Sequence, residues 1–272
     1  MEKFTLPLSS EITLSGLKWE IDNPKANLIL VHGAGEHVGR YNHWAKLFNH
    51  QLINVYGVDH YGHGNSPGTR GHLTNYELYL NEIKALKKMI DDQADVLPLL
   101  LYGHSLGGNI VLNWILEQEK SVDYVIASAP WIKLKLVPPT WKISLMKWLS
   151  GILPALSQSN ELDPNWLSRD KLVVERYIND TLVHNKITLS AANILFQRAE
   201  ILETYNKQII DKVLIIHGLD DKITDAAASQ AFATRTGIDY HGVKGLYHEL
   251  HNEPEQIEIF NYICNWLNKN GL

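Results

Sequence analysis

Short, continuous apolar runs alternate with amphipathic stretches along most of the chain. Runs of this kind are typical of strands that a parallel sheet buries on both faces, and they occur at residues 27–31, 53–58, 98–103, 122–129 and 213–217. Apolar positions three to four residues apart predict amphipathic helices at about 42–50, 75–94, 106–119, 226–236 and 253–268. Strict alternation around Trp19 predicts a hairpin or two short strands over 9–21, and a last short strand is predicted at 239–243.

The alternation of strands and helices predicts one large α/β domain with a mostly parallel, doubly wound sheet. Residues 130–203 interrupt this pattern once. We therefore expect residues 1–129 and 204–272 to form the core, and residues 130–203 to form a helical cap, or lid, inserted after the strand at 122–129. Ligands of such sheets bind at the carboxyl ends of the strands. Because the glycine-rich and polar clusters of this chain each follow a predicted strand, they are candidates for one shared site.

Ser105 lies between an apolar run and a helical pattern, in Gly103-His104-Ser105-Leu106-Gly107. The G-x-S-x-G pattern between a strand and a helix is a nucleophile elbow, in which a strained turn exposes the serine hydroxyl. Such a turn leaves no room for side chains at the flanking positions, so glycine is used there. The following helix directs backbone N–H groups and its positive dipole end at any anion that forms nearby. Ser105 is therefore the candidate nucleophile.

A serine hydroxyl needs a general base, and the base needs a carboxylate that orients it. In folds with this elbow the chain order is serine, acid, histidine. Asp220 and Asp221 both follow a predicted strand, and a spacing of three residues from Gly218 favours Asp221. The candidate base is His248, between the last predicted strand and the last helix, with His251 three residues further on.

The tetrahedral intermediate of acyl transfer needs N–H donors for its oxyanion. One is expected from Leu106, the residue after the nucleophile. The other is expected from Ala34 in the sequence HGAG, where a small residue between glycines lets the backbone approach a substrate closely. Removal of one such donor typically costs about 3–4 kcal/mol in the reaction barrier.

Five motifs together resemble those of the monoacylglycerol lipases, which are serine hydrolases with the α/β-hydrolase fold. They are HGAGEHVGRY (32–41), D-x-x-G-x-G-x-S (59–66), GHSLGG (103–108), G-x-x-D (218–221) and G-x-x-H-E-L-H-x-E (245–253). The resemblance covers about residues 28–267, and HGAGEH with GRY is its most specific part. It implies that polar groups near the elbow hold the glycerol end of a substrate, and the matching residues are Glu36, Arg40 and His251. The alternative is a surface Glu36–Arg40 pair and a histidine on a helix face.

Large apolar residues are concentrated in the first half of the expected cap. Five of them fall on one helical face: Trp141, Leu145, Trp148, Leu149 and Ile152. This helix either packs on the core below it, or lines an acyl channel and dips into a lipid interface. The two tryptophans and the nearby lysines favour the second interpretation, with transient contact to membranes or micelles.

Composition narrows the classes of partner and location. Thirty acidic and 25 basic residues give a net charge of −5, without the basic footprint of a nucleic-acid-binding protein. The N-terminus lacks the apolar segment of a signal peptide, and no run of about 18 apolar residues predicts a membrane span. The single cysteine, Cys264, excludes an internal disulfide and is expected to be an inert buried thiol in the cytoplasm. No cluster has metal-ligand spacing, so neither a metal nor an organic cofactor is expected.

These features predict a serine ester hydrolase that cleaves monoacylglycerol to fatty acid and glycerol through an acyl-enzyme. The same triad fits a lysophospholipase or another carboxylesterase; a lysophospholipase would need cationic cap residues for a phosphate. It also fits a proline-iminopeptidase-like aminopeptidase, which would need acidic cap residues for a substrate ammonium. Four cap carboxylates keep that alternative open: Glu161, Asp163, Asp170 and Glu175. A non-catalytic ligand receptor on the same fold is the alternative from a different class, and the complete triad argues against it.

Overall fold

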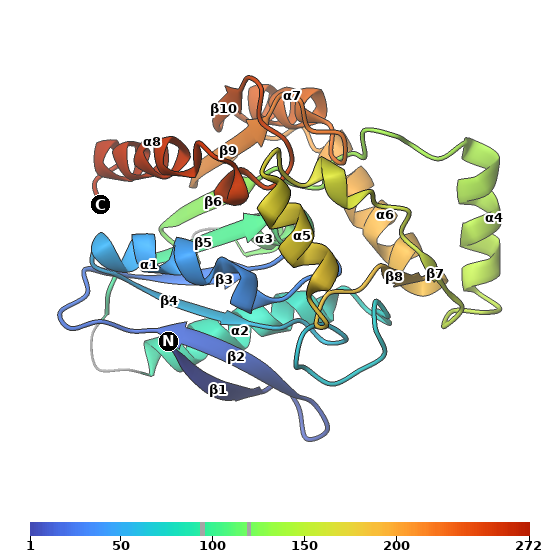
Figure 1. Ribbon diagram of the computed structural model, residues 1–272, viewed down its shortest axis with the longest axis horizontal. Coiled ribbons are helices and arrows are strands. Elements are labelled where there is room, and N and C mark those ends of the chain that lie inside the picture. The colour runs from blue at the N-terminus through green and yellow to red at the C-terminus, as the bar shows by residue number, and fades with distance from the viewer. Residues whose placement is uncertain (93–95, 119–120) are drawn as a thin grey trace.

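An eight-stranded sheet runs through the centre of the molecule, in the order β1-β2-β4-β3-β5-β6-β9-β10 (Figure 1). β2 pairs antiparallel with β1 and β4, and the other neighbouring pairs are parallel. The computed structural model describes residues 1–92, 96–118 and 121–272. The strands are β1 (Glu2–Pro7), β2 (Thr13–Trp19), β3 (Ala26–Val31), β4 (Ile53–Val58), β5 (Leu99–His104), β6 (Tyr124–Ser128), β9 (Lys212–Gly218) and β10 (Asp239–Val243). The predicted mostly parallel, doubly wound sheet is confirmed.

Helices cover both faces of this sheet. On one face, α1 (Asn42–His50) and α8 (Gln256–Lys269) bury an aromatic cluster. On the other face lie α2 (Glu77–Asp91), α3 (Leu106–Glu117) and α7 (Ala226–Thr236). The central strands β3, β4, β5 and β6 are buried at every position, which explains why their sequences are continuous apolar runs. The described residues also form the short 3-10 turns η1 (Val38–Tyr41), η2 (Pro164–Trp166) and η3 (Leu250–Asn252).

The predicted boundaries match the structure for α1, β4, α7 and β10, whereas the N-terminal hairpin is shifted. We predicted it over 9–21, but its first strand is β1, at the very start of the chain. The turn lies between β1 and β2, where the Ser9 hydroxyl accepts hydrogen bonds from the N–H groups of Glu11 and Ile12, both at 3.2 Å. Within β1 only Phe4 and Leu6 are covered and the other positions are exposed, so its apolar signal is short. The predicted ends of two helices, at residues 94 and 119, lie outside the described residues.

The chain leaves the sheet after β6 and returns to it at β9, a strand that pairs with β6. Between them lie α4 (Thr140–Ser150), β7 (Ser157–Ser159), η2, α5 (Lys171–Asn179), β8 (Lys186–Thr188) and α6 (Leu189–Thr204). In Figure 1 these elements lie beyond the arrowhead of β5, and α4 is the outermost of them. The prediction of a cap over 130–203 concerns this segment. In the described part of the chain, no helix combines the length and apolar character needed to cross a membrane.

Candidate active site

Ser105 occupies the turn between β5 and α3. Its backbone angles, φ 55° and ψ −112°, are a combination that residues other than glycine rarely adopt. A Cβ at Gly107 would lie 1.9 Å from the carbonyl oxygen of Val31, and one at Gly103 would lie 2.2 Å from that of Gly107. Neither position therefore admits a side chain. The Ser105 N–H donates to the carbonyl of Ser128 at 2.9 Å, which fixes the turn against β6. The strained turn directs Ser105 to a pocket at the carboxyl ends of the strands.

Asp221 and His248 lie on the loops that follow β9 and β10, and their side chains meet. The Nδ1 atom of His248 lies 2.7 Å from Asp221 Oδ2, and Asp221 Oδ1 accepts the N–H groups of Ile223 at 2.7 Å and Thr224 at 3.1 Å. His248 lines the same pocket as Ser105. Asp220 is exposed, whereas Asp221 is buried. The geometry therefore favours Asp221 over Asp220 as the orienting acid.

Burial and neighbouring charges set the protonation of these groups. Burial by itself would raise the pKa of Asp221, but His248 and the hydrogen bonds from His217 and His248 hold that pKa well below its ordinary value. Burial would lower the pKa of His248, but the Asp221 carboxylate outweighs it and raises that pKa. The ring of His104 lies 4.7 Å from that of His248, and burial lowers the pKa of His104 to about 3. An ionised acid beside a basic imidazole is the arrangement that general-base catalysis by a serine triad needs.

The two expected oxyanion donors line the pocket together with Ser105. Leu106 is the first residue of α3, so its N–H is among the helix-terminal N–H groups that have no partner within the helix. Ala34 follows β3, which lies beside β5 in the sheet. Two loops that are distant in sequence thus bring their backbones to the serine.

An ion cluster lines the pocket close to Ala34. Arg40 donates two hydrogen bonds to Glu249, at 2.6 and 2.7 Å, and a third to Glu36, at 2.5 Å. Glu36 also accepts hydrogen bonds from the Gly33 N–H at 2.6 Å and from the Tyr41 hydroxyl at 2.7 Å. Because Glu36 is 3% exposed, the alternative of a surface Glu36–Arg40 pair is wrong.

Glu249 is a pocket residue that we did not single out from the sequence. It directly follows His248 in the motif G-x-x-H-E, and Arg40 lies 209 residues before it. Burial would raise the pKa of Glu249, but Arg40 outweighs it and holds that pKa below its ordinary value. Its position next to the candidate base was the one local signal of a role in the site.

Replacing Arg40 by methionine should destabilise the fold strongly. The substitution leaves Glu36 and Glu249 buried without a counter-charge, and removal of one partner from a buried ionic cluster typically costs about 3–5 kcal/mol. Urea unfolding at neutral pH measures this loss. The matched control is Lys88→Met, which breaks an exposed pair with Asp92 and should leave the unfolding midpoint unchanged. An Arg40→Met midpoint equal to that of the native protein would contradict the assignment of a stabilising cluster.

The structure does not bring His251 to the pocket. Its side chain is fully buried, with its ring stacked 4.5 Å from that of Tyr41 and edge-on to that of His104, at 4.9 Å. Within the described residues, neither of its ring nitrogens has a hydrogen-bond partner. The reason is the 3-10 turn η3, which places His251 on the side of α1, where the His43 ring nitrogen contacts its carbonyl at 2.8 Å. The expectation that His251 holds the glycerol end of a substrate is therefore not supported.

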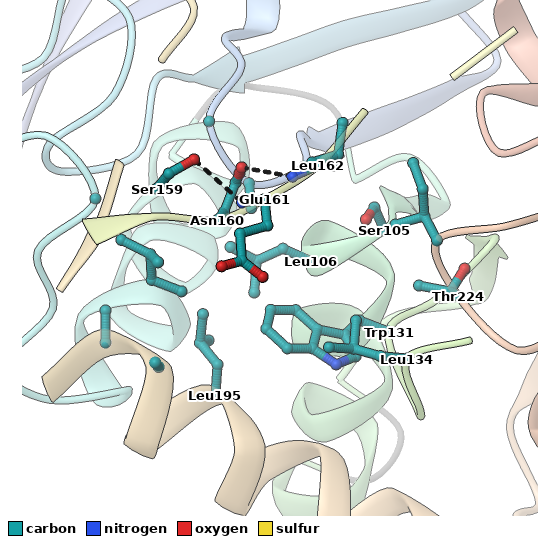
Figure 2. Close-up of a pocket in the computed structure, with 18 of the residues that line it drawn as sticks. Ser105, Leu106, Trp131, Leu134, Ser159, Asn160, Glu161, Leu162, Leu195 and Thr224 are labelled. Carbon is teal, nitrogen blue, oxygen red and sulfur yellow. Dashed lines mark hydrogen bonds between the residues drawn. The ribbon is translucent and has the colours of Figure 1, made fainter. Parts of the chain in front are cut away.

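The pocket has a volume of about 440 Å³, and its walls are largely apolar. Figure 2 shows Leu106, Trp131, Leu134 and Leu195 around the same space as Ser105. The segment between β6 and β9 supplies most of the remaining apolar wall: Leu136, Ile143, Leu145, Met146, Leu149, Leu162, Ile187, Leu189 and Phe196. Such a pocket suits a molecule with a long apolar chain in the pocket and a polar end at the serine.

Helix α4 contributes to this wall with one part of its surface only. Leu145, Met146 and Leu149 line the pocket, whereas Trp141 and Trp148 are 67% and 64% exposed. The single apolar face predicted for this helix is thus divided between the pocket and the outer surface. The interpretation that α4 packs on the core is not supported, because none of its residues is buried.

Two expectations concern side chains outside the pocket. Cys264 is partly buried in α8, and burial raises the pKa of its thiol to about 11, so it is protonated at neutral pH. Over residues 1–92, 96–118 and 121–272, no three His, Cys, Asp or Glu side chains are grouped in a way that would hold a metal ion.

Comparison with known proteins places the chain in a family. The model of the family described as serine aminopeptidase S33 matches residues 22–255. A monoacylglycerol lipase of Mycolicibacterium smegmatis is 30% identical over 92% of this chain and 90% of its own length. An uncharacterised abhydrolase domain-containing protein of Dictyostelium discoideum is 37% identical over 95% of this chain, which spans 28% of that protein.

Solved structures agree with this placement. The crystal structure of a monoacylglycerol lipase from Paleococcus ferrophilus has a TM-score of 0.87 and 33% identity, over 95% of this chain and 99% of the other. The resemblance inferred from the five motifs is thereby confirmed. The chain belongs to the serine aminopeptidase S33 family, has the α/β-hydrolase fold, and is similar to monoacylglycerol lipases over nearly its whole length.

Proposed function

We propose that this chain hydrolyses monoacylglycerols to a fatty acid and glycerol, with Ser105 as the nucleophile. The observation that carries the proposal is an apolar pocket of about 440 Å³ that has Ser105, His248, Glu36 and Glu249 among its lining residues. A monoacylglycerol matches this combination of an apolar pocket and a few polar groups, because it has a long acyl chain and a small polar end joined by the ester. The names of the relatives in Mycolicibacterium smegmatis and Paleococcus ferrophilus support the same substrate class.

The reaction proceeds in two steps. His248 Nε2 takes the proton of Ser105 Oγ as this oxygen attacks the ester carbonyl, and Asp221 stabilises the imidazolium that forms. The N–H groups of Ala34 and Leu106 hold the oxyanion. The ester bond then breaks, and glycerol leaves with the proton from His248. Water, deprotonated by His248, attacks the acyl-enzyme, releases the fatty acid and restores the serine.

The polar end of the substrate meets the Glu36–Arg40–Glu249 cluster. Arg40 already donates three hydrogen bonds to the two carboxylates, so it is better suited to bracing them than to binding substrate directly. Carboxylate oxygens accept hydrogen bonds from hydroxyl groups. Glu36 and Glu249 are therefore the proposed acceptors for glycerol hydroxyls.

The cap carboxylates favour an ester over a peptide substrate. Asp163 and Asp170 accept hydrogen bonds from backbone N–H groups at the starts of η2 and α5, and Glu175 is exposed on α5, outside the pocket. Glu161 alone of the four lines the pocket, and it faces Lys142 at 3.8 Å. Of the four cap carboxylates, a substrate ammonium in the pocket would meet only Glu161, which is already paired, whereas a neutral glycerol needs no counter-charge.

The substrate class is tested by release of oleate from 1-monooleoylglycerol, with proline 4-nitroanilide as the counter-substrate. We expect oleate release and no nitroaniline. Cleavage of the anilide without release of oleate would move the substrate to peptides and contradict the proposal. A lysophosphatidylcholine assay in parallel separates a monoacylglycerol lipase from a lysophospholipase.

We also propose that the outer face of α4 contacts the lipid surface that holds the substrate. Trp141 and Trp148 are more than half exposed there, near the exposed Lys147, and Ile152, just after the helix, is also more than half exposed. Amphipathic helices with aromatic residues and lysines bind at the boundary of headgroups and acyl chains. The same helix lines the pocket, so a substrate leaving the lipid surface would pass directly to Ser105.

Replacing Trp141 and Trp148 together by alanine should weaken binding to phosphatidylcholine vesicles by about tenfold or more, because each tryptophan loses burial in the lipid. Co-sedimentation measures this change. Hydrolysis of soluble 4-nitrophenyl butyrate should stay within about twofold of the native rate, since neither side chain lines the pocket. Ile257→Ala on α8, a site also half exposed, is the control. Unchanged vesicle binding of the double variant would refute the proposed contact.

A further inference from the structure

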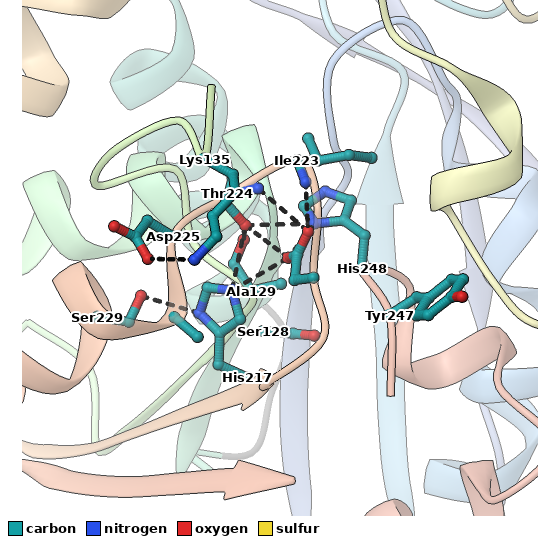
Figure 3. Close-up of polar contacts among 12 residues, drawn as sticks. Ser128, Ala129, Lys135, His217, Ile223, Thr224, Asp225, Ser229, Tyr247 and His248 are labelled. Carbon is teal, nitrogen blue, oxygen red and sulfur yellow. Dashed lines mark hydrogen bonds and ion pairs between the residues drawn. The ribbon is translucent and has the colours of Figure 1, made fainter. Parts of the chain in front are cut away.

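Two histidines converge on the carboxylate of Asp221. Figure 3 shows His217, Thr224 and His248 meeting at one carboxylate oxygen. His217 Nε2 lies 3.0 Å from Asp221 Oδ2, and the Thr224 hydroxyl donates to the same oxygen at 2.8 Å. His217 ends the apolar run of β9, and its side chain is fully buried. The reaction proposed above gives this second imidazole no role.

A third residue, Ser229, fits the tautomer of His217 that Asp221 requires. The Ser229 hydroxyl, also fully buried, lies 2.9 Å from His217 Nδ1. Asp221 is ionised and can only accept, so His217 Nε2 must donate to it. A neutral imidazole then has its lone pair on Nδ1, where it accepts the Ser229 proton. The chain Ser229–His217–Asp221–His248 therefore has each donor facing an acceptor.

We propose that His217 is a positioning residue for catalysis, held in its Nε2-protonated form by Asp221 and Ser229 together, and that it orients Asp221 and limits the basicity of His248. This inference rests on the proposed function, since it assigns His248 as the base. His217 contacts Asp221 Oδ2, the same oxygen that faces His248. The two imidazoles therefore share the negative charge that makes His248 a strong base. Asp221 Oδ1 is held separately by the N–H groups of Ile223 and Thr224, so the loop keeps its shape without His217.

Loss of the His217 donor should act on His248 in a defined direction. The carboxylate loses one of the partners that stabilise its charge, so more of that charge acts on His248 and the pKa of His248 rises. The other groups facing His248 come from separate elements and stay unchanged: His104 at the end of β5, Glu36 after β3, and Glu249 and His251 around η3, with Arg40 paired to both glutamates. The acid limb of kcat/KM should therefore move to higher pH.

The test compares His217→Leu with His217→Gln, two side chains of similar size of which only glutamine carries an N–H donor. A hydrogen bond to an ionised group changes its pKa by on the order of one unit, and part of this passes to His248, so the leucine variant should shift the acid limb upward by about half a pH unit. Its kcat should fall about tenfold, with KM within about twofold. The glutamine variant should have an acid limb and a kcat close to those of the native protein. His241→Leu, on the neighbouring strand β10, removes a histidine that stacks on Tyr262 and should leave the profile unchanged.

Rates are measured per active site, titrated with a fluorophosphonate, and urea unfolding follows stability separately. Equal loss of stability in both variants, with kcat per active site and the acid limb unchanged, would show that His217 is only structural and overturn the proposal. If the leucine variant does not fold, Ser229→Ala decides the matter. Without the hydroxyl, His217 Nδ1 loses its donor and the ring is held less firmly against Asp221, so a smaller shift in the same direction is expected, and a native profile would overturn the proposal.

The profile is recorded on both 1-monooleoylglycerol and 4-nitrophenyl butyrate, so that the two proposals can fail separately. A native protein that cleaves only the nitrophenyl ester contradicts the monoacylglycerol substrate, and the comparison of His217 variants then proceeds on that ester. A native protein that cleaves monoacylglycerol, with identical profiles for all variants, contradicts the role of His217 alone.

Discussion

Replacing Ser105 by alanine should lower hydrolysis of 1-monooleoylglycerol by about 10⁴-fold or more, because removal of the nucleophile of a serine triad abolishes the acyl-enzyme route. The oxyanion donors and the pocket remain, so a small residual rate is expected. The substitution removes one oxygen from a partly exposed position and should not affect folding. Oleate release, measured with labelling by a fluorophosphonate probe, checks both consequences at once.

The matched control is Ser190→Ala on α6. Its hydroxyl donates to the carbonyl of Leu73 at 2.7 Å and lies outside the pocket, so activity and labelling should remain. Undiminished oleate release or probe labelling in Ser105→Ala would show that another residue is the nucleophile and would refute the proposed mechanism.

Replacing Asp221 by asparagine should lower kcat by about 10³- to 10⁴-fold. Asparagine keeps the size of the side chain but has one oxygen where the carboxylate has two. Either its NH₂ group faces His248 and selects the wrong tautomer of the base, or it faces the N–H groups of Ile223 and Thr224 and loses their hydrogen bonds. The imidazolium that forms during attack also loses its counter-charge. Steady-state kinetics at a pH above the acid limb measures the effect without interference from protonation of His248.

Asp220→Asn is the control for this second prediction, and it also decides between the two aspartates that the sequence offered. Asp220 is exposed, so its substitution should change kcat by less than about twofold. The opposite result, a large loss in Asp220→Asn with near-native activity in Asp221→Asn, would reject the Asp221–His248 pair as the base and its orienting acid.

The sequence alone determined the elements whose signals are local. The apolar runs of β3 to β6 were visible because both faces of these strands are buried, and the amphipathic patterns of α1 and α7 placed those helices correctly. The elbow at Ser105 was visible because the tight turn requires glycines at positions two residues from the serine, where a side chain would clash with the backbone. Asp221 and His248 followed from the order and spacing of motifs at the ends of predicted strands.

Only the tertiary structure decided which distant groups pair. The contact of Arg40 with Glu249 joins loops 209 residues apart, and no local pattern carries it. In the sequence, His217 is simply the last residue of an apolar strand. Its donor role was not visible there, because that role depends on Ser229 twelve residues later and on the turn that brings Asp221 back to it. His251 matched a family motif, yet the turn η3 directs it to Tyr41 rather than to the pocket. Local patterns determine whether a segment forms a helix or a strand, whereas the packing of the whole chain determines which partner a buried polar side chain finds.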